Sequence, residues 1–200
     1  MNKTSRLSTI LATIALTAPL SAAAVVVSGV ANLWPGSTAA APPPELPGAS
    51  SQLRANLANF DDLDFRVYST QQWQDVHLSH ADDVIVHWPN GRDTQGLATH
   101  IEDMKWMFSF APDTKIEEHP VRFGTNDAEW TAVTSWLEGT FTKPMVDWKG
   151  NVTPPTNKHF RIRMVTLGHW NSAGLMNEEF LFWDNQEFYS QLGLLPQSTQ

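Results

Sequence analysis

The sequence of 200 residues contains no cysteine, which excludes disulfide bonds and catalysis by a thiolate. Basic residues are also scarce, because 13 Lys and Arg stand against 21 Asp and Glu and give a formal net charge of −8 at pH 7. A nucleic-acid partner is therefore not expected, since binding to phosphates depends on clustered Lys and Arg. The sequence has no Walker A, G-x-G-x-x-G or G-x-S-x-G motif, so nothing indicates a phosphate cradle, a dinucleotide site or the nucleophile elbow of α/β-hydrolases.

Apolar aromatic residues are abundant, with nine Trp and ten Phe against two Tyr. Large cores use aromatic side chains, and so do cavities that bind apolar ligands, and the composition leaves both uses open. With 42% hydrophobic residues, the chain has enough apolar material for the core of one globular domain with additional segments.

The N-terminal segment, residues 1–40, has two early basic residues, Lys3 and Arg6, and no further charge. This pattern is typical of a signal peptide or an N-terminal anchor, and we expect an exported protein, periplasmic or extracellular, that contacts the membrane only if the segment is uncleaved. Residues 41–52 are rich in Pro and Ala and are predicted to form a disordered linker. The folded domain is predicted over residues 53–200.

Helices precede strands in the predicted domain. Apolar residues at helical spacing predict one or two short helices from about residue 51, and an amphipathic helix is predicted over 96–110. A short strand between them carries β-branched residues at 84–86 and is ended by a Pro-Asn-Gly turn. Longer strand-like runs cover 115–123, 128–142, 159–170 and 175–184, and residues 147–158 read as a polar loop. Helices followed by a long antiparallel sheet make the fold class α+β.

Four stretches of the sequence carry a resemblance to a known family: DDVIVHWPNGRDTQGLATHIEDMKWMFSFAPDTKI, EGTFTKPM, PPTNKHFRIRMVTLGHW and EEFLFWDNQEFYSQLGLLP. Together they resemble the SnoaL-like polyketide cyclases, also called ester cyclases, over about residues 53–196. The resemblance implies a nuclear transport factor 2-like cone, in which a strongly bent antiparallel sheet is wrapped by helices around an apolar pocket. It also implies an intramolecular aldol closure by an Asp acting as acid and base, with no cofactor and no metal.

The acid of the family corresponds to Asp184, in a pattern that also includes Glu178 and Phe180. Strand alternation places these residues and Phe182 on one face of the last strand, and we expect Glu178, Phe180 and Phe182 to contact the substrate. The opposite face carries Glu179, Leu181 and Trp183. Neighbouring phenyl rings would raise the pKa of Asp184 and allow it to exchange protons. The alternative is that Asp184 only caps the helix that follows.

His87 and His169 are the further candidates for catalysis. His87 lies on the predicted strand around 84–86, and its ordinary explanation is a neutral histidine satisfied by one hydrogen bond. His169 ends a long strand close to Glu178, where it could orient the acid or polarise a carbonyl group. Its alternative role is that of a turn residue facing the solvent.

We expect three tryptophans, Trp88, Trp136 and Trp170, to contact the substrate, although burial in a core explains Trp136 and Trp170 better. The segment around His77 and His80, with its neighbouring Asp residues, has metal-ligand chemistry but no H-E-x-x-H spacing or partner set. It is interpreted as a solvated loop, and no metal is expected.

Two functions follow from these residues. The first is an exported cyclase-type enzyme that performs aldol cyclisation, isomerisation or dehydration of a small hydrophobic carbonyl compound. The alternative is a non-catalytic module of the same fold that binds a small hydrophobic ligand. The fold also allows an isologous homodimer through the outer face of the sheet.

Overall fold

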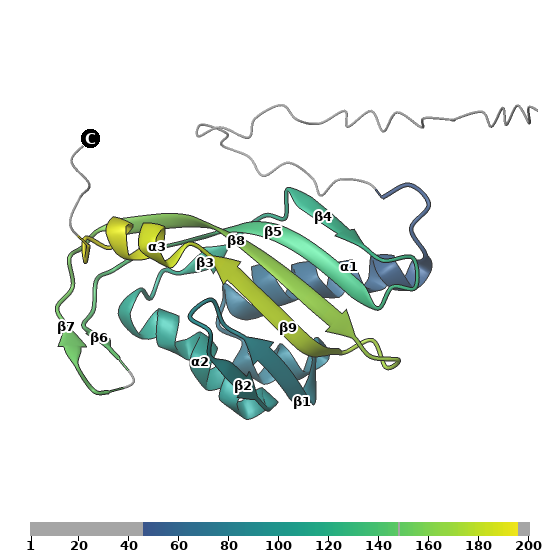
Figure 1. Cartoon of the computed structure of the whole chain (residues 1–200), viewed down its shortest axis with the longest axis horizontal. Coiled ribbons are helices and arrows are strands. Elements are labelled where there is room, and N and C mark those ends of the chain that lie inside the picture. Colours follow the sequence, from purple (N-terminus) through teal and green to yellow (C-terminus); the bar gives the residue numbers. More distant parts are fainter. Residues whose placement is uncertain (1–45, 148, 196–200) are drawn as a thin grey trace, which may run out of the picture. The chain divides into compact units, whose positions relative to one another are not determined.

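The computed structural model describes residues 46–147 and 149–195 (Figure 1). The predicted signal segment, residues 1–40, and the first part of the linker lie outside the described residues. Helix α1 (Ser51–Asp62) begins within the predicted linker, because the hydroxyl of Ser50 accepts a hydrogen bond from the backbone N–H of Leu53 and caps it. No helix in the described part of the chain is long and apolar enough to span a membrane.

Short helical segments follow α1, as the apolar spacing predicts. A π-helical segment, η1 (Leu63–Tyr68), continues α1 directly, and a 3-10 segment, η2 (Trp73–Leu78), leads into the first strand. The amphipathic helix is present as α2 (Leu97–Phe110). A last helix, α3 (Asn185–Gln191), ends the described domain.

The main sheet has seven strands in the order β2-β1-β9-β8-β5-β3, with β4 also paired to β5. Its strands are β1 (His80–His87), β2 (Asp93–Gln95), β3 (Lys115–Ile116), β4 (Val121–Gly124), β5 (Trp130–Thr140), β8 (His159–Trp170) and β9 (Met176–Trp183). Every pair is antiparallel except β1 and β9, which run parallel. The sheet is curved and, within the described residues, not closed into a barrel, so the expected α+β class is confirmed.

Two predicted elements differ in detail from those in the structure. The strand expected over 115–123 is split into β3 and β4, and the interruption contains Pro120, which has no N–H to donate to a ladder. The polar loop 147–158 contributes to a small hairpin of β6 (Met145–Val146) and β7 (Val152–Thr153). The hairpin stands at the end of the sheet near α2 and α3 (Figure 1), and it supplies part of the cavity wall described below.

Alternation along the strands separates an inner from an outer face. On β8, the residues from Phe160 to Trp170 at even positions are buried, and the residues between them are more exposed. The inner face is covered by α1 and α2 (Figure 1). Phe160 is fully buried there and meets Phe188 of α3 edge to face, with ring centroids 5.1 Å apart. This contact fixes α3 against the sheet.

Replacing Phe160 with Ala should lower the free energy of unfolding by about 3–5 kcal/mol, because it leaves a cavity in the core. The matched control is Phe123→Ala on β4, where the side chain is 58% exposed and the expected change is within about 0.5 kcal/mol. Urea unfolding monitored by tryptophan fluorescence measures both values. Similar losses for the two variants would contradict the assignment of the inner face.

Candidate active site

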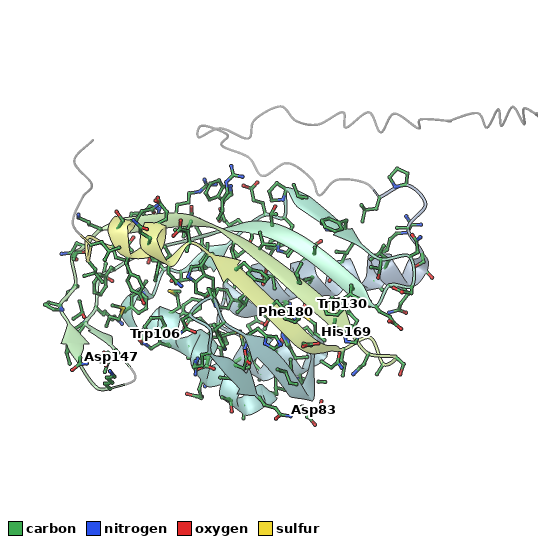
Figure 2. All side chains as sticks on the ribbon, in the orientation of Figure 1. Asp83, Trp106, Trp130, Asp147, His169 and Phe180 are labelled. Atoms are coloured by element: carbon green, nitrogen blue, oxygen red, sulfur yellow. The ribbon has the colours of Figure 1, made fainter. Side chains whose placement is uncertain are left out.

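A cavity of about 1060 Å³ lies between the inner face of the sheet and α2. The sheet provides Leu137, Met164, Thr166, Glu179 and Leu181, and α2 provides a facing set that includes His100, Met104 and Met107. Segment η1, the loop 88–92, the β6–β7 hairpin and α3 complete the walls. Trp106 on α2 donates a hydrogen bond from Nε1 to the carbonyl oxygen of Val146 at 2.8 Å, which joins the helix to the hairpin at this end (Figure 2). Apolar walls with a few polar groups are typical of small-molecule sites.

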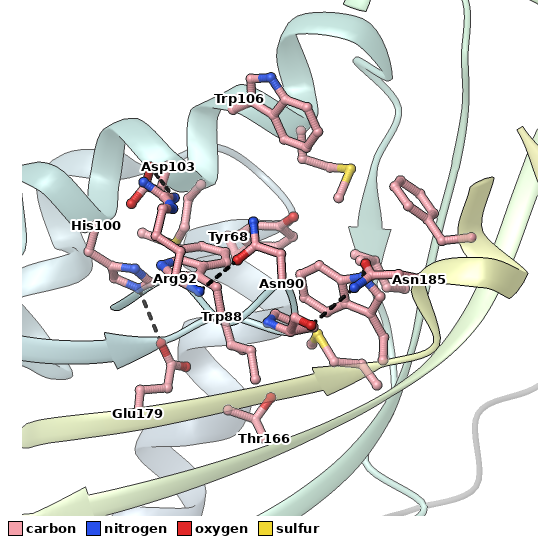
Figure 3. A pocket seen from close by; sticks show the side chains of 18 of the residues that line it. Tyr68, Trp88, Asn90, Arg92, His100, Asp103, Trp106, Thr166, Glu179 and Asn185 are labelled. Atoms are coloured by element: carbon pink, nitrogen blue, oxygen red, sulfur yellow. Dashed lines mark hydrogen bonds and ion pairs between the residues drawn. The ribbon is translucent and has the colours of Figure 1, made fainter. Parts of the chain in front are cut away.

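The first polar group in the cavity wall is formed by His100 of α2 and Glu179 of β9, and His80 of β1 completes their cluster without lining the cavity. Figure 3 shows His100 and Glu179 pointing toward one another. The distance from Nε2 of His100 to Oε2 of Glu179 is 3.4 Å, and the distance from Nε2 of His80 to the same oxygen is 3.8 Å. All three residues are buried. Burial lowers the pKa of His100 to about 4 against the opposing charge of Glu179, so its ring is neutral near pH 7.

The second polar group is Asp64 of η1, a buried carboxyl that also lines the cavity. Its Oδ2 lies 2.8 Å from Nε2 of His119, and Nδ1 of the same ring lies 2.8 Å from Oδ1 of Asp61. Arg122 contacts the other oxygen of Asp61. Burial raises the pKa of Asp64, whereas the hydrogen bond from His119 opposes the rise. The cavity therefore contains two buried carboxyl groups, Asp64 and Glu179, held in different surroundings.

The rim of the cavity is held by polar contacts between separate segments. Arg92 forms a salt bridge of 2.7 Å with Asp103 of α2, and Nε1 of Trp88 donates to the hydroxyl of Thr94 at 2.9 Å. Asn185 donates from Nδ2 to the carbonyl oxygen of Pro89 at 3.1 Å. These contacts tie the loop 88–92 to both neighbouring helices, so the loop forms a fixed wall.

Asp184 does not lie in this cavity, and its predicted place in the apolar pocket is wrong. The side chain is exposed and caps α3, where Oδ1 accepts hydrogen bonds from the backbone N–H groups of Gln186 and Glu187 at 2.8 and 3.1 Å. It borders a small hollow that also contains Trp136 and two arginines. Strand parity explains the difference, because the face of β9 that carries Asp184 is the outer face. The capping role that the sequence left open is the one the structure supports.

The other predicted residues of β9 and the two histidines also lie on the outer face, which corrects their expected positions. His87 is bonded to Asp93 at 2.8 Å and to Glu178 at 2.9 Å, and its ring stacks on Phe180 with centroids 4.1 Å apart. Partial burial lowers the pKa of His87, but the bonds to these carboxylates outweigh it and raise the pKa. Phe182 is 49% exposed. None of these residues lines the cavity.

His169 lies outside the cavity as well. Its Nδ1 is 2.8 Å from Oδ1 of Asn177, and its ring packs against Trp130 with centroids 4.7 Å apart. Figure 2 shows His169, Trp130 and Phe180 gathered at one end of strands β8 and β9. His169 therefore cannot orient an acid or polarise a carbonyl group in this cavity.

The three predicted tryptophans lie in three different surroundings. Trp88 lines the cavity. Trp170 is buried against α1, where its Nε1 donates to the hydroxyl of Thr131 at 2.8 Å. Trp136 lies on the outer face beneath Arg161, whose guanidinium carbon is 3.9 Å from the ring centroid. Only Trp88 of this set can contact a molecule in the cavity.

Sequence reasoning missed Asp64, His100 and Glu179 as site residues. Glu179 could have been found, because the alternation along β9 already separates it from Glu178. His100 is one helical turn before Met104 and shares its buried face, but a polar residue on an apolar face gives no indication of its partner. Asp64 and His80 come close to the other residues of the site only in the tertiary structure, so no local sequence pattern identifies them.

Comparisons with known proteins agree with this fold. The family described as SnoaL-like polyketide cyclase matches residues 52–192. No match was found among the curated proteins. Among solved structures, a protein classed with the polyketide cyclases from Xanthomonas campestris is 11% identical, with a TM-score of 0.62 over 71% of this chain and 99% of its own.

Two further solved structures are similar in fold. TsrD from Streptomyces laurentii is 14% identical with a TM-score of 0.58, over 76% of this chain and 100% of its own. A SnoaL-like polyketide cyclase from Agrobacterium tumefaciens is 15% identical with a TM-score of 0.53, over 72% of this chain and 99% of its own. At these identities the likeness concerns the arrangement of helices and strands.

Replacing Asp184 with Ala should lower the free energy of unfolding by about 0.5–2 kcal/mol, because the first turn of α3 loses its cap. Asp184→Asn should retain most of the stability, since Asn caps helices as well as Asp does. Thermal unfolding of both variants measures the difference. Equal stability of the Ala and Asn variants would contradict the capping role.

The contribution of His119 to stability should depend on pH. Burial lowers its pKa, but hydrogen bonds to Asp61 and Asp64 outweigh this and raise the pKa from 6.5 to about 9. Because the folded state binds the proton more tightly, the stabilisation is full below pH 6.5 and is lost as the pH rises through about 9. The unfolding free energy of the wild type should exceed that of His119→Gln most at low pH, and the gap should narrow toward pH 10. A gap independent of pH would show that His119 does not carry this charge.

Proposed function

The chain belongs to the SnoaL-like polyketide cyclase family, and from this premise we propose that it performs cyclase-type or isomerase-type acid–base chemistry on a small hydrophobic carbonyl compound bound in the cavity. The observation that carries the proposal is the buried carboxyl of Asp64 in an otherwise largely apolar wall. Burial raises the pKa of Asp64, which makes its carboxylate a stronger base and suits it to take and return a proton. Asp64 therefore assumes the acid–base role that the sequence assigned to Asp184.

The reaction uses one carboxyl group twice. The carboxylate of Asp64 removes a proton from the carbon next to a carbonyl group, and the resulting enolate attacks a second carbonyl carbon of the same molecule. The new alkoxide then takes the proton back from Asp64, so the product has the composition of the substrate. Return of the proton to a different carbon of the enolate gives an isomer, and loss of water after ring closure gives a dehydrated product.

His119 is a positioning residue for Asp64. Its Nε2–H binds Oδ2, which leaves Oδ1 for the substrate. Asp61 holds the opposite nitrogen of the ring, so the ring cannot turn without breaking a second bond. The substrate carbonyl lies at the other polar group, His100 and Glu179, where a buried imidazole can orient its oxygen.

Export and pairing are also proposed for this protein. Export rests on the signal-like pattern of residues 1–40. Isologous pairing rests on apolar side chains that the outer face of the sheet exposes, which include Val121, Phe123, Val165 and Phe182. Light scattering of the purified protein distinguishes a dimer from a monomer.

Turnover of a panel of hydrophobic diketones and lactones should be lost, by more than about 100-fold, in Asp64→Asn. The isosteric amide cannot accept and return the proton, whereas it can still occupy the same space. Asp184→Asn is the matched control, because it removes a carboxyl on the outer face, and it should keep the rate of the wild type. Chromatography of the products provides the rates.

A loss of activity in Asp184→Asn together with full activity in Asp64→Asn would overturn the assignment. If no compound in the panel is converted but several quench the tryptophan fluorescence of the cavity with saturation, the protein is the non-catalytic binding module of the same fold. In that case Asp64→Asn should change the affinity for the compounds that quench the fluorescence.

A further inference from the structure

We propose that His80, His100 and Glu179 form a binding site for a divalent transition-metal ion, best fitted by Zn²⁺, in the wall of the cavity. The donors come from three elements that are far apart in the sequence, β1, α2 and β9. A ligand atom of each lies within 4.8 Å of those of the other two. Two imidazoles and one carboxylate are a donor set that zinc and other first-row metals prefer.

The spacing of the donor atoms fits a metal better than a hydrogen-bond network. Nε2 of His100 and Nε2 of His80 lie 3.4 and 3.8 Å from Oε2 of Glu179, and these distances exceed those of ordinary N–H···O bonds. Donors about 2.1 Å from a tetrahedral zinc ion lie about 3.4 Å from one another. Two of the three donor pairs therefore lie at or near the separation that a tetrahedral ion requires, and all three atoms lie within 4.8 Å of one another.

The hydrogen bonds around His80 hold its Nε2 toward Glu179. The hydroxyl of Ser79 lies 3.0 Å from the carbonyl oxygen of Val76, which accepts its only hydrogen, and 2.9 Å from Nδ1 of His80. With that hydrogen donated to Val76, the hydroxyl oxygen accepts from Nδ1–H of His80 and holds the ring from its far side. A hydrogen bond on the far nitrogen is the arrangement that metal-binding histidines show.

Two of the ligand atoms face one another in a buried place. Nε2 of His80 and Oε2 of Glu179 have no hydrogen-bond partner in the part of the chain that the structure describes. The side chains of both are almost fully buried, with exposures of 0% and 5%. Buried polar atoms without a partner cost free energy when water is excluded, and a cation bound by both atoms would remove this cost.

The open coordination position of the ion would face the cavity, because His100 and Glu179 line it whereas His80 does not. Three protein ligands with one open position are typical of catalytic zinc sites. We infer that the open position takes the carbonyl oxygen of the substrate. This point alone rests on the proposed function. Asp64, which is not among the three ligands, keeps its role in proton transfer.

The full-length protein, stripped of metal with a chelator and then dialysed, should bind one equivalent of Zn²⁺ in isothermal titration calorimetry. Bound Co²⁺ should give the visible absorption of a four-coordinate site. His100→Ala and Glu179→Gln should each weaken zinc binding by more than about 100-fold, and Ser79→Ala, which removes the partner of His80, by about 10-fold to 100-fold. Circular dichroism shows whether each variant is folded, and Glu179→Gln preserves shape if His100→Ala does not fold.

The matched control is His87→Ala, because His87 with Asp93 and Glu178 is a second histidine–carboxylate cluster on the outer face. This variant should keep the full equivalent of zinc and its affinity. The absence of saturable binding in the wild type, or binding that Glu179→Gln leaves unchanged, would overturn the proposal. Calorimetry and the Co²⁺ spectrum do not depend on turnover. A negative result for the metal site can therefore be distinguished from a negative result for Asp64 in catalysis.

Discussion

Buried charge must be compensated inside an apolar domain, and this constraint organises the centre of the molecule. The network of His119 shows one solution, in which a single imidazole lies between the carboxylates of Asp61 and Asp64, and Arg122 pairs with Asp61. Compensation of the charge of Glu179 is less complete, because Nε2 of His100 and Nε2 of His80 lie 3.4 and 3.8 Å from its Oε2. A folded chain keeps such an incomplete cluster at the expense of stability, and this loss is common at functional sites.

The two clusters divide the chemistry of the cavity between them. Asp64 is fixed by bonds to one oxygen and has a raised pKa, which suits proton transfer. The cluster around Glu179 suits the binding of a carbonyl oxygen, either by the buried imidazole of His100 or through a metal ion held by the three side chains. The family supports the cofactor-free form of this chemistry, and the spacing of the donors is what suggests a metal in this particular chain.

Much of the fold could be predicted from the sequence, because periodic apolar residues determine helices and strands locally. The helix α2, the strand β8 and the turn after β1 all lie where the spacing and the turn residues place them. The site was harder to predict for a specific reason. Alternation along β9 defines two faces, and the phenyl rings of Phe180 and Phe182 favoured the wrong one, although large apolar side chains also occur on exposed faces. Which face is covered by α2 is a property of the tertiary structure.

The central claim is that the ligand site lies on the inner face, between Asp64 and the cluster of His100 and Glu179. A crystal structure of the protein with a hydrophobic 1,3-diketone tests it most directly. The claim predicts the compound inside the cavity, with one oxygen directed at His100 and Glu179 and a carbon chain beside Asp64. A compound seated on the outer face against Trp136 and Asp184 would contradict it.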